Sequence, residues 1–141
     1  MSAYIPVHLR IQIQAADRNR CGYCLTSETN SGIPSAYAHI RPRSKGGKTE
    51  FENLCQACRP CNEFKGDLVE VVDPLSGQMV ALFHPRTQVW NAHFEWSFEG
   101  AQIIGLTDVG RATVVALQMN NLTIVTARRR WVIAGWHPPE N

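Results

Sequence analysis

The chain has 141 residues, of which 44% are apolar, and its formal net charge is +2 at neutral pH. A chain of this length fits a single domain, residues 1–141, that buries roughly two thirds of the surface exposed in the unfolded state. No apolar run approaches the roughly 20 residues of a membrane helix, and no stretch has the form of a secretory signal peptide. We therefore expect a cytoplasmic protein without a membrane partner.

The small net charge conceals an asymmetry along the chain. Residues 1–66 carry nine Lys or Arg against five acidic residues, a net charge of +4, whereas residues 67–141 carry five against seven, a net charge of −2. Basic charge gathered in one segment is typical of nucleic-acid binding, and an ordinary solvated face is the alternative.

The first half of the chain predicts short elements separated by polar loops. A proline at the start and polar residues at the end indicate a helix over residues 6–19, although the alternation in "LRIQIQ" also fits a strand. The composition then predicts a loop over 25–35, a strand over 36–40, a loop over 41–51, a returning strand over 53–57 and a short helix over 59–67.

The second half predicts two hairpins and two helices. The first hairpin spans residues 67–86 and turns between Asp73 and Gly77, and the second spans residues 93–107 and turns near Glu99 and Gly100. Capping side chains then place helices from Thr107 to about Gln118, and from Asn120 or Asn121 to about Ala134.

All five cysteines lie between residues 21 and 61, in C-x-x-C spacings. The odd number argues against a secreted disulfide framework. Two such pairs can bind one tetrahedral zinc ion, since each supplies two sulfurs from a tight turn. Cys21 and Cys24 form the first pair. We prefer Cys58 and Cys61 for the second, because Pro60 and Asn62 suit a turn that opens a helix, which leaves Cys55 as a core residue.

Two other interpretations of the cysteines stay open. A thioredoxin-like redox site would need one C-x-x-C after a strand in a βαβ pattern. Unrelated buried thiols are the second, because cysteine is a common core residue. A structural zinc would instead stabilise a segment that has few large apolar side chains, by on the order of 10 kcal/mol or more, without performing chemistry.

The segment "HIRPRSKGGKTEFENLCQACRPCNEFKG", residues 39–66, resembles the HNH endonuclease motif, in which H-I-x-P is followed by G-G, N-L and C-x-x-C-N-x-x-K-G after an earlier C-x-x-C pair. The matching residues are His39, Ile40, Pro42, Gly46, Gly47, Asn53, Leu54, Cys58, Cys61, Asn62, Lys65 and Gly66. A weaker likeness to small bacterial HNH proteins extends over residues 17–135.

The resemblance implies an α+β protein with a zinc-stapled ββα-metal (His-Me finger) core over residues 17–67 and a C-terminal extension of hairpins and two helices over 68–141. His39 would be the general base that activates water against a phosphodiester, since histidine titrates near neutral pH. Asn53 would hold the loop and orient the His39 ring. Asn62 would bind one catalytic divalent cation, Mg²⁺ or another, which stabilises the departing oxygen.

The resemblance also implies that DNA is the partner. Five cations of the motif would contact its phosphates without reading sequence: Arg41, Arg43, Lys45, Lys48 and Lys65. Cutting a palindromic site would require a homodimer.

One position departs from the motif. The residue before the histidine usually supplies a second ligand to the catalytic cation, but here it is Ala38, whose methyl group cannot bind a metal. Three explanations stay open. His84 or His93 supplies the missing ligand, the substitution inactivates the enzyme while folding and DNA binding persist, or water and substrate phosphate complete a weakly held ion.

We therefore expect a metal-dependent DNA endonuclease or nickase. The first alternative is a catalytically impaired HNH-fold module that binds nucleic acid. The second is a zinc-stabilised interaction domain whose basic loop contacts a protein.

Overall fold

The computed structural model describes residues 4–140, a mixed α/β chain with three small antiparallel sheets in that range. It divides into two compact units, and each is described by itself. The first comprises the chain up to Val69 together with His84–Gln88, and the second comprises Glu70–Phe83 and the chain from Val89 onward. Within residues 4–140, none of the helices has the length and apolar character needed to cross a membrane.

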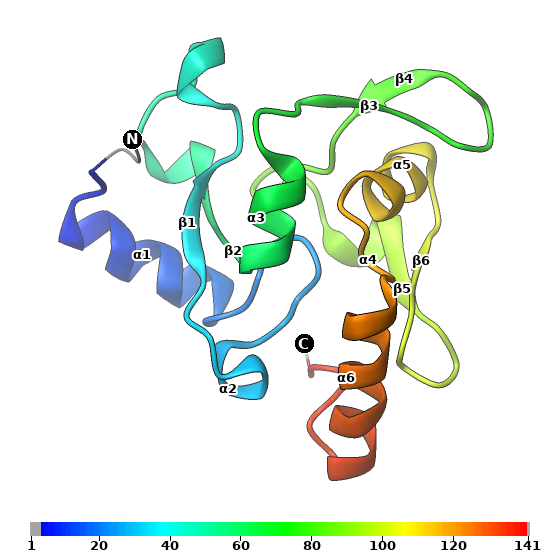
Figure 1. Cartoon of the computed structure of the whole chain (residues 1–141). Helices are drawn as coiled ribbons and strands as arrows, with labels where there is room; N and C mark the ends of the chain where they lie inside the picture. Colours follow the sequence, from blue (N-terminus) through cyan, green and yellow to red (C-terminus); the bar gives the residue numbers. More distant parts are fainter. Residues whose placement is uncertain (1–3, 141) are drawn as a thin grey trace. The chain divides into compact units, whose positions relative to one another are not determined.

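The first unit is built around a two-stranded hairpin. Its elements are α1 (Val7–Asp17), α2 (Glu28–Ser31), β1 (Ala36–His39), the 3₁₀ turns η1 (Arg43–Lys45) and η2 (Phe51–Asn53), β2 (Leu54–Ala57) and α3 (Arg59–Lys65). Strand β1 pairs antiparallel with β2, so that His39 lies opposite Leu54 and Ala38 lies opposite Cys55. Helices α1 and α3 flank this hairpin (Figure 1), with α1 against β2 and α3 against β1.

Helix α1 confirms the helical interpretation of residues 6–19. Pro6 precedes it, and the helix ends where Arg18 adopts a left-handed conformation at φ 57°. Its buried residue Ile13 packs with Ile5 and Leu54 into the apolar core of this unit. Burial against β2 therefore favours the helix, because only one face of "LRIQIQ" meets the core.

The second unit consists of two hairpins and three helices among the described residues. Its elements are β3 (Glu70–Val72), β4 (Met79–Ala81), α4 (Trp90–His93), β5 (Phe94–Trp96), β6 (Ile103–Gly105), α5 (Asp108–Ala116) and α6 (Leu122–Ala134). Both predicted hairpins are confirmed, with β3 pairing to β4 and β5 to β6.

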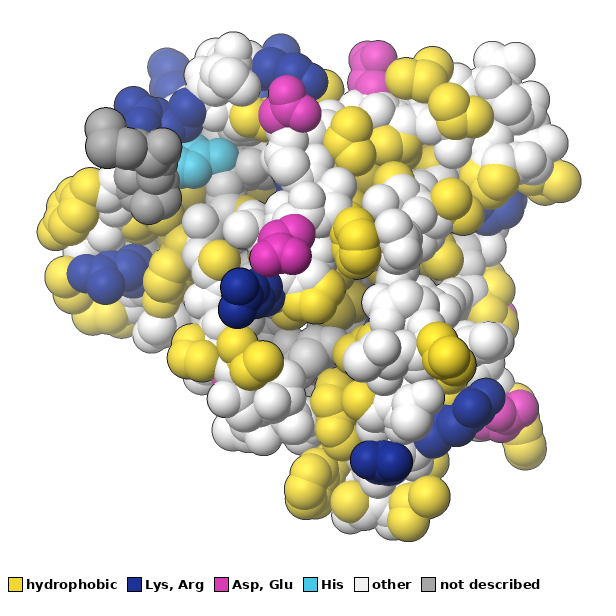
Figure 2. Space-filling view, viewed as in Figure 1, with side chains coloured by type: hydrophobic (Ala, Val, Ile, Leu, Met, Phe, Trp, Pro, Cys, Tyr) yellow, Lys and Arg dark blue, Asp and Glu magenta, His cyan; other side chains and the backbone are white. Residues whose placement is uncertain are grey.

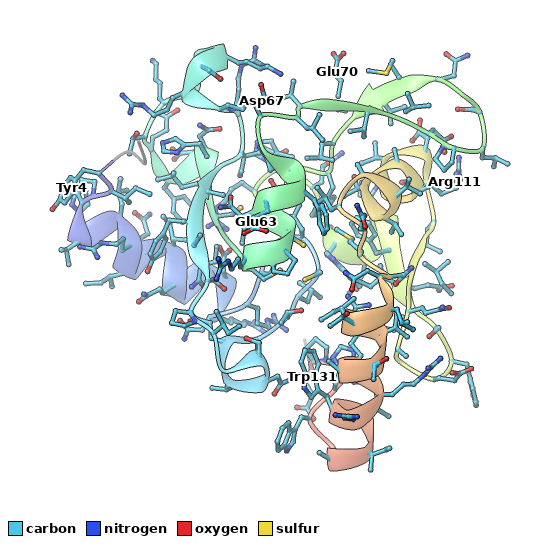
Figure 3. All side chains as sticks on the ribbon, viewed as in Figure 1. Tyr4, Glu63, Asp67, Glu70, Arg111 and Trp131 are labelled. Carbon is cyan, nitrogen blue, oxygen red and sulfur yellow. The ribbon has the colours of Figure 1, made fainter. Side chains whose placement is uncertain are left out.

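Asp73 organises the turn of the first hairpin. Its carboxylate accepts hydrogen bonds from the main-chain nitrogens of Leu75 and Ser76 and is paired with the guanidinium of Arg111 on α5, at 2.9 Å. Figure 3 marks Arg111 beside this hairpin. The guanidinium holds the pKa of Asp73 well below its usual range.

Both predicted caps are confirmed. The Thr107 hydroxyl accepts from the nitrogen of Gly110, and the Asn121 side chain accepts from the nitrogen of Ile124. Asn120, the other candidate for the last cap, instead bonds the main chain of Ile103 on β6.

Two short helices, α2 and α4, differ from the prediction. Residues 25–35 contain the single turn α2, because the Ser27 side chain caps it by accepting from the nitrogen of Asn30. Helix α4 lies where no helix was predicted, and its first residue Trp90 stacks on Phe94 and Trp96. Helix α5 also ends at Ala116, earlier than predicted.

Candidate functional site

The four predicted cysteines form one cluster. The Sγ atoms of Cys21, Cys24, Cys58 and Cys61 all lie within 4.8 Å of one another, and the Sγ atoms of Cys24 and Cys58 are 3.6 Å apart. Four sulfurs at such distances, from two tight turns, match the donor set of a structural zinc site. The residues present therefore fit a zinc ion, which would join the turn after α1 to the start of α3.

Main-chain hydrogen bonds fix the turn that carries the sulfurs of Cys21 and Cys24. The main-chain nitrogens of Tyr23 and Cys24 point at the Cys21 sulfur, at 3.4 and 3.5 Å. The nitrogen of Gly22 donates to the carbonyl of Gln56 in β2 at 2.7 Å, which fixes this turn against the hairpin. The second pair belongs to α3, since Cys58 is the residue before the helix and Cys61 lies in its first turns.

Burial and the neighbouring sulfurs change the ionisation of these thiols in different directions. Burial raises the pKa of Cys21, and hydrogen bonding from Cys21 lowers the pKa of Cys24. Without a metal the cluster can therefore hold one thiolate that its neighbours stabilise, whereas a zinc ion would stabilise all four sulfurs as thiolates.

Cys55 lies outside the cluster. It is fully buried in β2 opposite Ala38, and burial raises the pKa of its thiol to about 12. This agrees with the preferred choice of Cys58 and Cys61 and with a core role for Cys55.

His39 ends β1 and is half-buried. Its Nε2 atom lies 2.9 Å from Oγ1 of Thr49, on the far side of the loop that joins the two strands. Burial lowers the pKa of His39, and the positive charges of Arg43 and Lys65 lower it further. The ring is therefore mainly neutral near pH 7, the form in which an imidazole nitrogen accepts a proton.

Asn53 bridges the two ends of the loop that follows His39. Its Oδ1 accepts from the nitrogen of Arg41 at 2.8 Å, and its Nδ2 donates to the carbonyls of Arg41 and Lys48 at 3.0 and 2.9 Å. Its own carbonyl accepts from the nitrogen of Ile40. Asn53 thus fixes the main chain directly after His39, while the bond to the ring itself comes from Thr49.

Two adjacent glycines allow the loop to close on Asn53. Gly46 has φ +84°, the left-handed region that favours glycine, and it ends the turn η1. A Cβ at Gly47 would lie only 1.8 Å from the carbonyl oxygen of Arg41 and 2.9 Å from Nδ2 of Asn53. The second glycine is therefore needed for close approach of two backbone segments.

Four of the predicted phosphate contacts are exposed on this loop: Arg41, Arg43, Lys45 and Lys48. Figure 2 shows Lys and Arg side chains gathered over the loop between β1 and β2. Two of them have partners within the unit, since Nε of Arg41 donates to the carbonyl of Lys45 and Nζ of Lys45 donates to the carbonyl of Asp67. The loop therefore presents a cluster of positive charge beside His39.

The structure corrects the prediction that Lys65 contacts a phosphate. Its side chain is only 1% exposed, and its ammonium donates to the carbonyl of His39 at 3.3 Å. Burial lowers its pKa. In this arrangement Lys65 links α3 to the end of β1 from inside the protein and does not reach a phosphate outside it.

The structure leaves the predicted catalytic cation with weak support. Ala38 is 6% exposed within β1 and offers no ligand atom, and Asn62 is exposed on α3. Among residues 4–140, the four cysteines are the one group of three or more His, Cys, Asp or Glu side chains close enough to share a metal. Asn62 is therefore the one predicted protein ligand at this position, as the substitution at Ala38 implies.

The two histidines considered as substitute ligands have other contacts. Nδ1 of His84, in the first unit, accepts from the main-chain nitrogens of Arg86 and Thr87, both at 3.2 Å, and burial lowers its pKa. His93 belongs to the second unit, where its Nδ1 lies 2.7 Å from Oγ1 of Thr107.

Sequence reasoning missed two residues that contact this region. Thr49 stands among polar loop residues, and nothing in its neighbourhood marks it as the partner of His39. Arg86 lies beyond residue 67, where the core was expected to end, yet it forms an ion pair with Asp17.

Residues 21–75 match the family model described as HNH endonuclease. No curated protein and no solved structure is similar enough to count as a match. The matched residues contain all four clustered cysteines, His39 and Asn53, the residues on which the geometry above depends. Residues 21–75, somewhat more than a third of the chain, are therefore similar to the HNH endonuclease family.

Proposed function

We propose that this domain hydrolyses phosphodiester bonds of DNA, with His39 as the general base that takes a proton from the attacking water. The observation that carries the proposal is the arrangement of His39 at the end of β1. Its ring is bonded to Thr49, its carbonyl to Lys65, and the loop that follows it is closed by Asn53. A neutral imidazole held in this way can accept a proton without first losing one.

The basic loop supports DNA as the substrate. Arg41, Arg43, Lys45 and Lys48 are exposed on the segment that follows His39, where positive charge attracts a polyanion and neutralises its phosphates. Contacts of this kind do not read bases, so we expect binding that depends on salt and little on sequence. In this role Asn62 would be the protein ligand of the catalytic divalent cation, which stays part of the proposal.

A second candidate function is DNA binding without efficient cleavage. Ala38 favours it, because a buried methyl group occupies the position where the family usually has a metal ligand. Magnesium prefers oxygen ligands, carboxylates in particular, and one amide from Asn62 is a weak anchor.

Plasmid nicking separates the two functions. Supercoiled plasmid is incubated with the zinc-loaded protein and magnesium, manganese or nickel, beside His39→Ala and Ala38→Asp. If the starting protein nicks the plasmid and His39→Ala does not, the result supports nuclease activity with His39 as the base. Nicking by Ala38→Asp alone identifies an inactivated nuclease that still binds DNA. If all three proteins are silent with every metal, while zinc content and melting temperature are normal, the hydrolase proposal is wrong.

A further inference from the structure

A short segment from outside the family match completes the unit that carries the site. Residues His84–Gln88 follow the β3–β4 hairpin and lie beyond residue 75, yet they group with the first compact unit. Pro85 packs against the first cysteine turn, since a Cβ at Gly22 would lie 3.0 Å from the Cβ of Pro85. A chain ended at residue 75 would lack these contacts.

Arg86 makes the main polar contacts of this segment. Its Nη1 and Nη2 donate to the two carboxylate oxygens of Asp17, at 2.6 and 3.2 Å, and the two side chains are only 10% and 7% exposed. Asp17 also accepts from the nitrogen of Gln56 in β2 at 2.7 Å. This bidentate pair fixes the end of α1 and the middle of β2 to one guanidinium.

The same guanidinium holds the turn η2. Nε of Arg86 donates to the carbonyl of Phe51 at 3.4 Å, and the guanidinium carbon lies 4.4 Å from the centre of the Phe51 ring. Phe51 opens η2 and Asn53 closes it. Contacts therefore run from Arg86 through Phe51 to Asn53, the residue that joins both ends of the loop beside His39.

We propose that Arg86 is a positioning residue of the His39 site: by fixing Phe51 it holds Asn53 in the place from which Asn53 closes the loop over residues 41–48. Its effect on catalysis rests on the proposed function of His39. The coupling from Arg86 to Asn53 does not depend on that function, because it can be measured in a protein that does not cut DNA.

The test measures hydrogen exchange at two groups that Asn53 protects, its own side-chain amide and the main-chain nitrogen of Arg41. Two variants avoid leaving Asp17 as an unpaired buried charge, which would destabilise the fold for a separate reason. Arg86→Lys keeps a cation for Asp17 but has no Nε to reach Phe51. The double variant Asp17→Asn with Arg86→Met removes both charges.

A matched control is Arg59→Met, because the pair of Arg59 with Glu63 has side chains 77% and 65% exposed and such surface pairs contribute little. Figure 3 marks Glu63 on α3. We expect both Arg86 variants to keep about one zinc per chain while exchange at Asn53 and Arg41 speeds up about tenfold or more, as loss of a charge-assisted bond predicts. Arg59→Met should exchange at the starting rate.

Unchanged protection at Asn53 and Arg41 in a folded Arg86 variant would overturn the proposal, as would equal loss in Arg59→Met. If Arg86→Lys does not fold, the double variant decides. Plasmid nicking measured in parallel tests His39 separately, so a silent enzyme with accelerated exchange contradicts the proposed function and supports the positioning role.

Discussion

The Nε2 atom of His39 lies 2.9 Å from the Oγ1 atom of Thr49, and this hydroxyl is the partner that the structure gives the ring. A threonine hydroxyl both donates and accepts. If it accepts the proton of Nε2, the other ring nitrogen, Nδ1, keeps a free lone pair for the attacking water. The bond therefore relates the conformation of a loop residue to the protonation of the proposed base.

We predict that Thr49→Val releases the ring, whereas Thr49→Ser keeps it in place. Nitrogen NMR should show His39 with its proton on Nε2 in the starting protein and in the serine variant, and a mixture of tautomers in the valine variant. Cleavage, where measurable, should fall about tenfold at most, as expected for one neutral hydrogen bond. Thr87→Val is the control, since Thr87 is exposed. The same tautomer in Thr49→Val as in the starting protein would refute this.

The pH dependence follows from the environment of His39. Burial and two nearby cations lower its pKa from the usual 6.5. The proton-accepting form should therefore persist below pH 6.5, and the acid limb of the rate profile should lie below that value. Because the unfolded chain binds this proton more readily, stability should fall as the pH drops from about 6.5 toward the folded pKa. An NMR titration of His39 that gives a midpoint above 6.5 would contradict both expectations.

Removing the charge of Lys48 should change DNA binding, whereas removing the charge of Lys65 should change stability. Lys48 is exposed, so Lys48→Met should reduce the slope of log affinity against log salt for duplex DNA by about one. Lys65 is buried on the carbonyl of His39, so Lys65→Met should lower the melting temperature and leave that salt slope unchanged. The two slopes are measured by fluorescence anisotropy at several salt concentrations. A reduced slope in a folded Lys65→Met variant would show that Lys65 does reach phosphate.

The zinc cluster predicts unequal roles for neighbouring cysteines. Cys58→Ala should abolish binding of the ion and unfold much of the first unit, since structural zinc contributes on the order of 10 kcal/mol. Cys55→Ala should keep about one zinc per chain and lose only part of the packing in β2. Metal analysis and thermal melting measure the difference. A protein that keeps its zinc after Cys58→Ala and loses it after Cys55→Ala would reverse the assignment.

Much of the fold was predictable because its signals are local. The caps at Thr107 and Asn121 and the turn at Asp73 lie within a few residues of the bonds they make. Helix α4 was not predictable, because its aromatic residues are ordered by packing on β5 and not by a cap. Helix α1 was predicted with a strand as the alternative, because its alternating pattern fits both. The packing of Ile13 against Leu54 decides for the helix.

The features of the site likewise divide into those that the sequence predicts and those that depend on the tertiary structure. The sequence alone determined the cysteine cluster, the hairpin that carries His39 and the glycine pair, because each depends on spacing within one short segment. The tertiary structure decided the roles of Thr49, Lys65 and Arg86. Thr49 meets His39 across a closed loop, Lys65 is buried by the packing of α3 on β1, and Arg86 meets Asp17 from 69 residues away. Contacts between residues that are distant in sequence, and the burial they cause, leave no pattern that a single sequence displays.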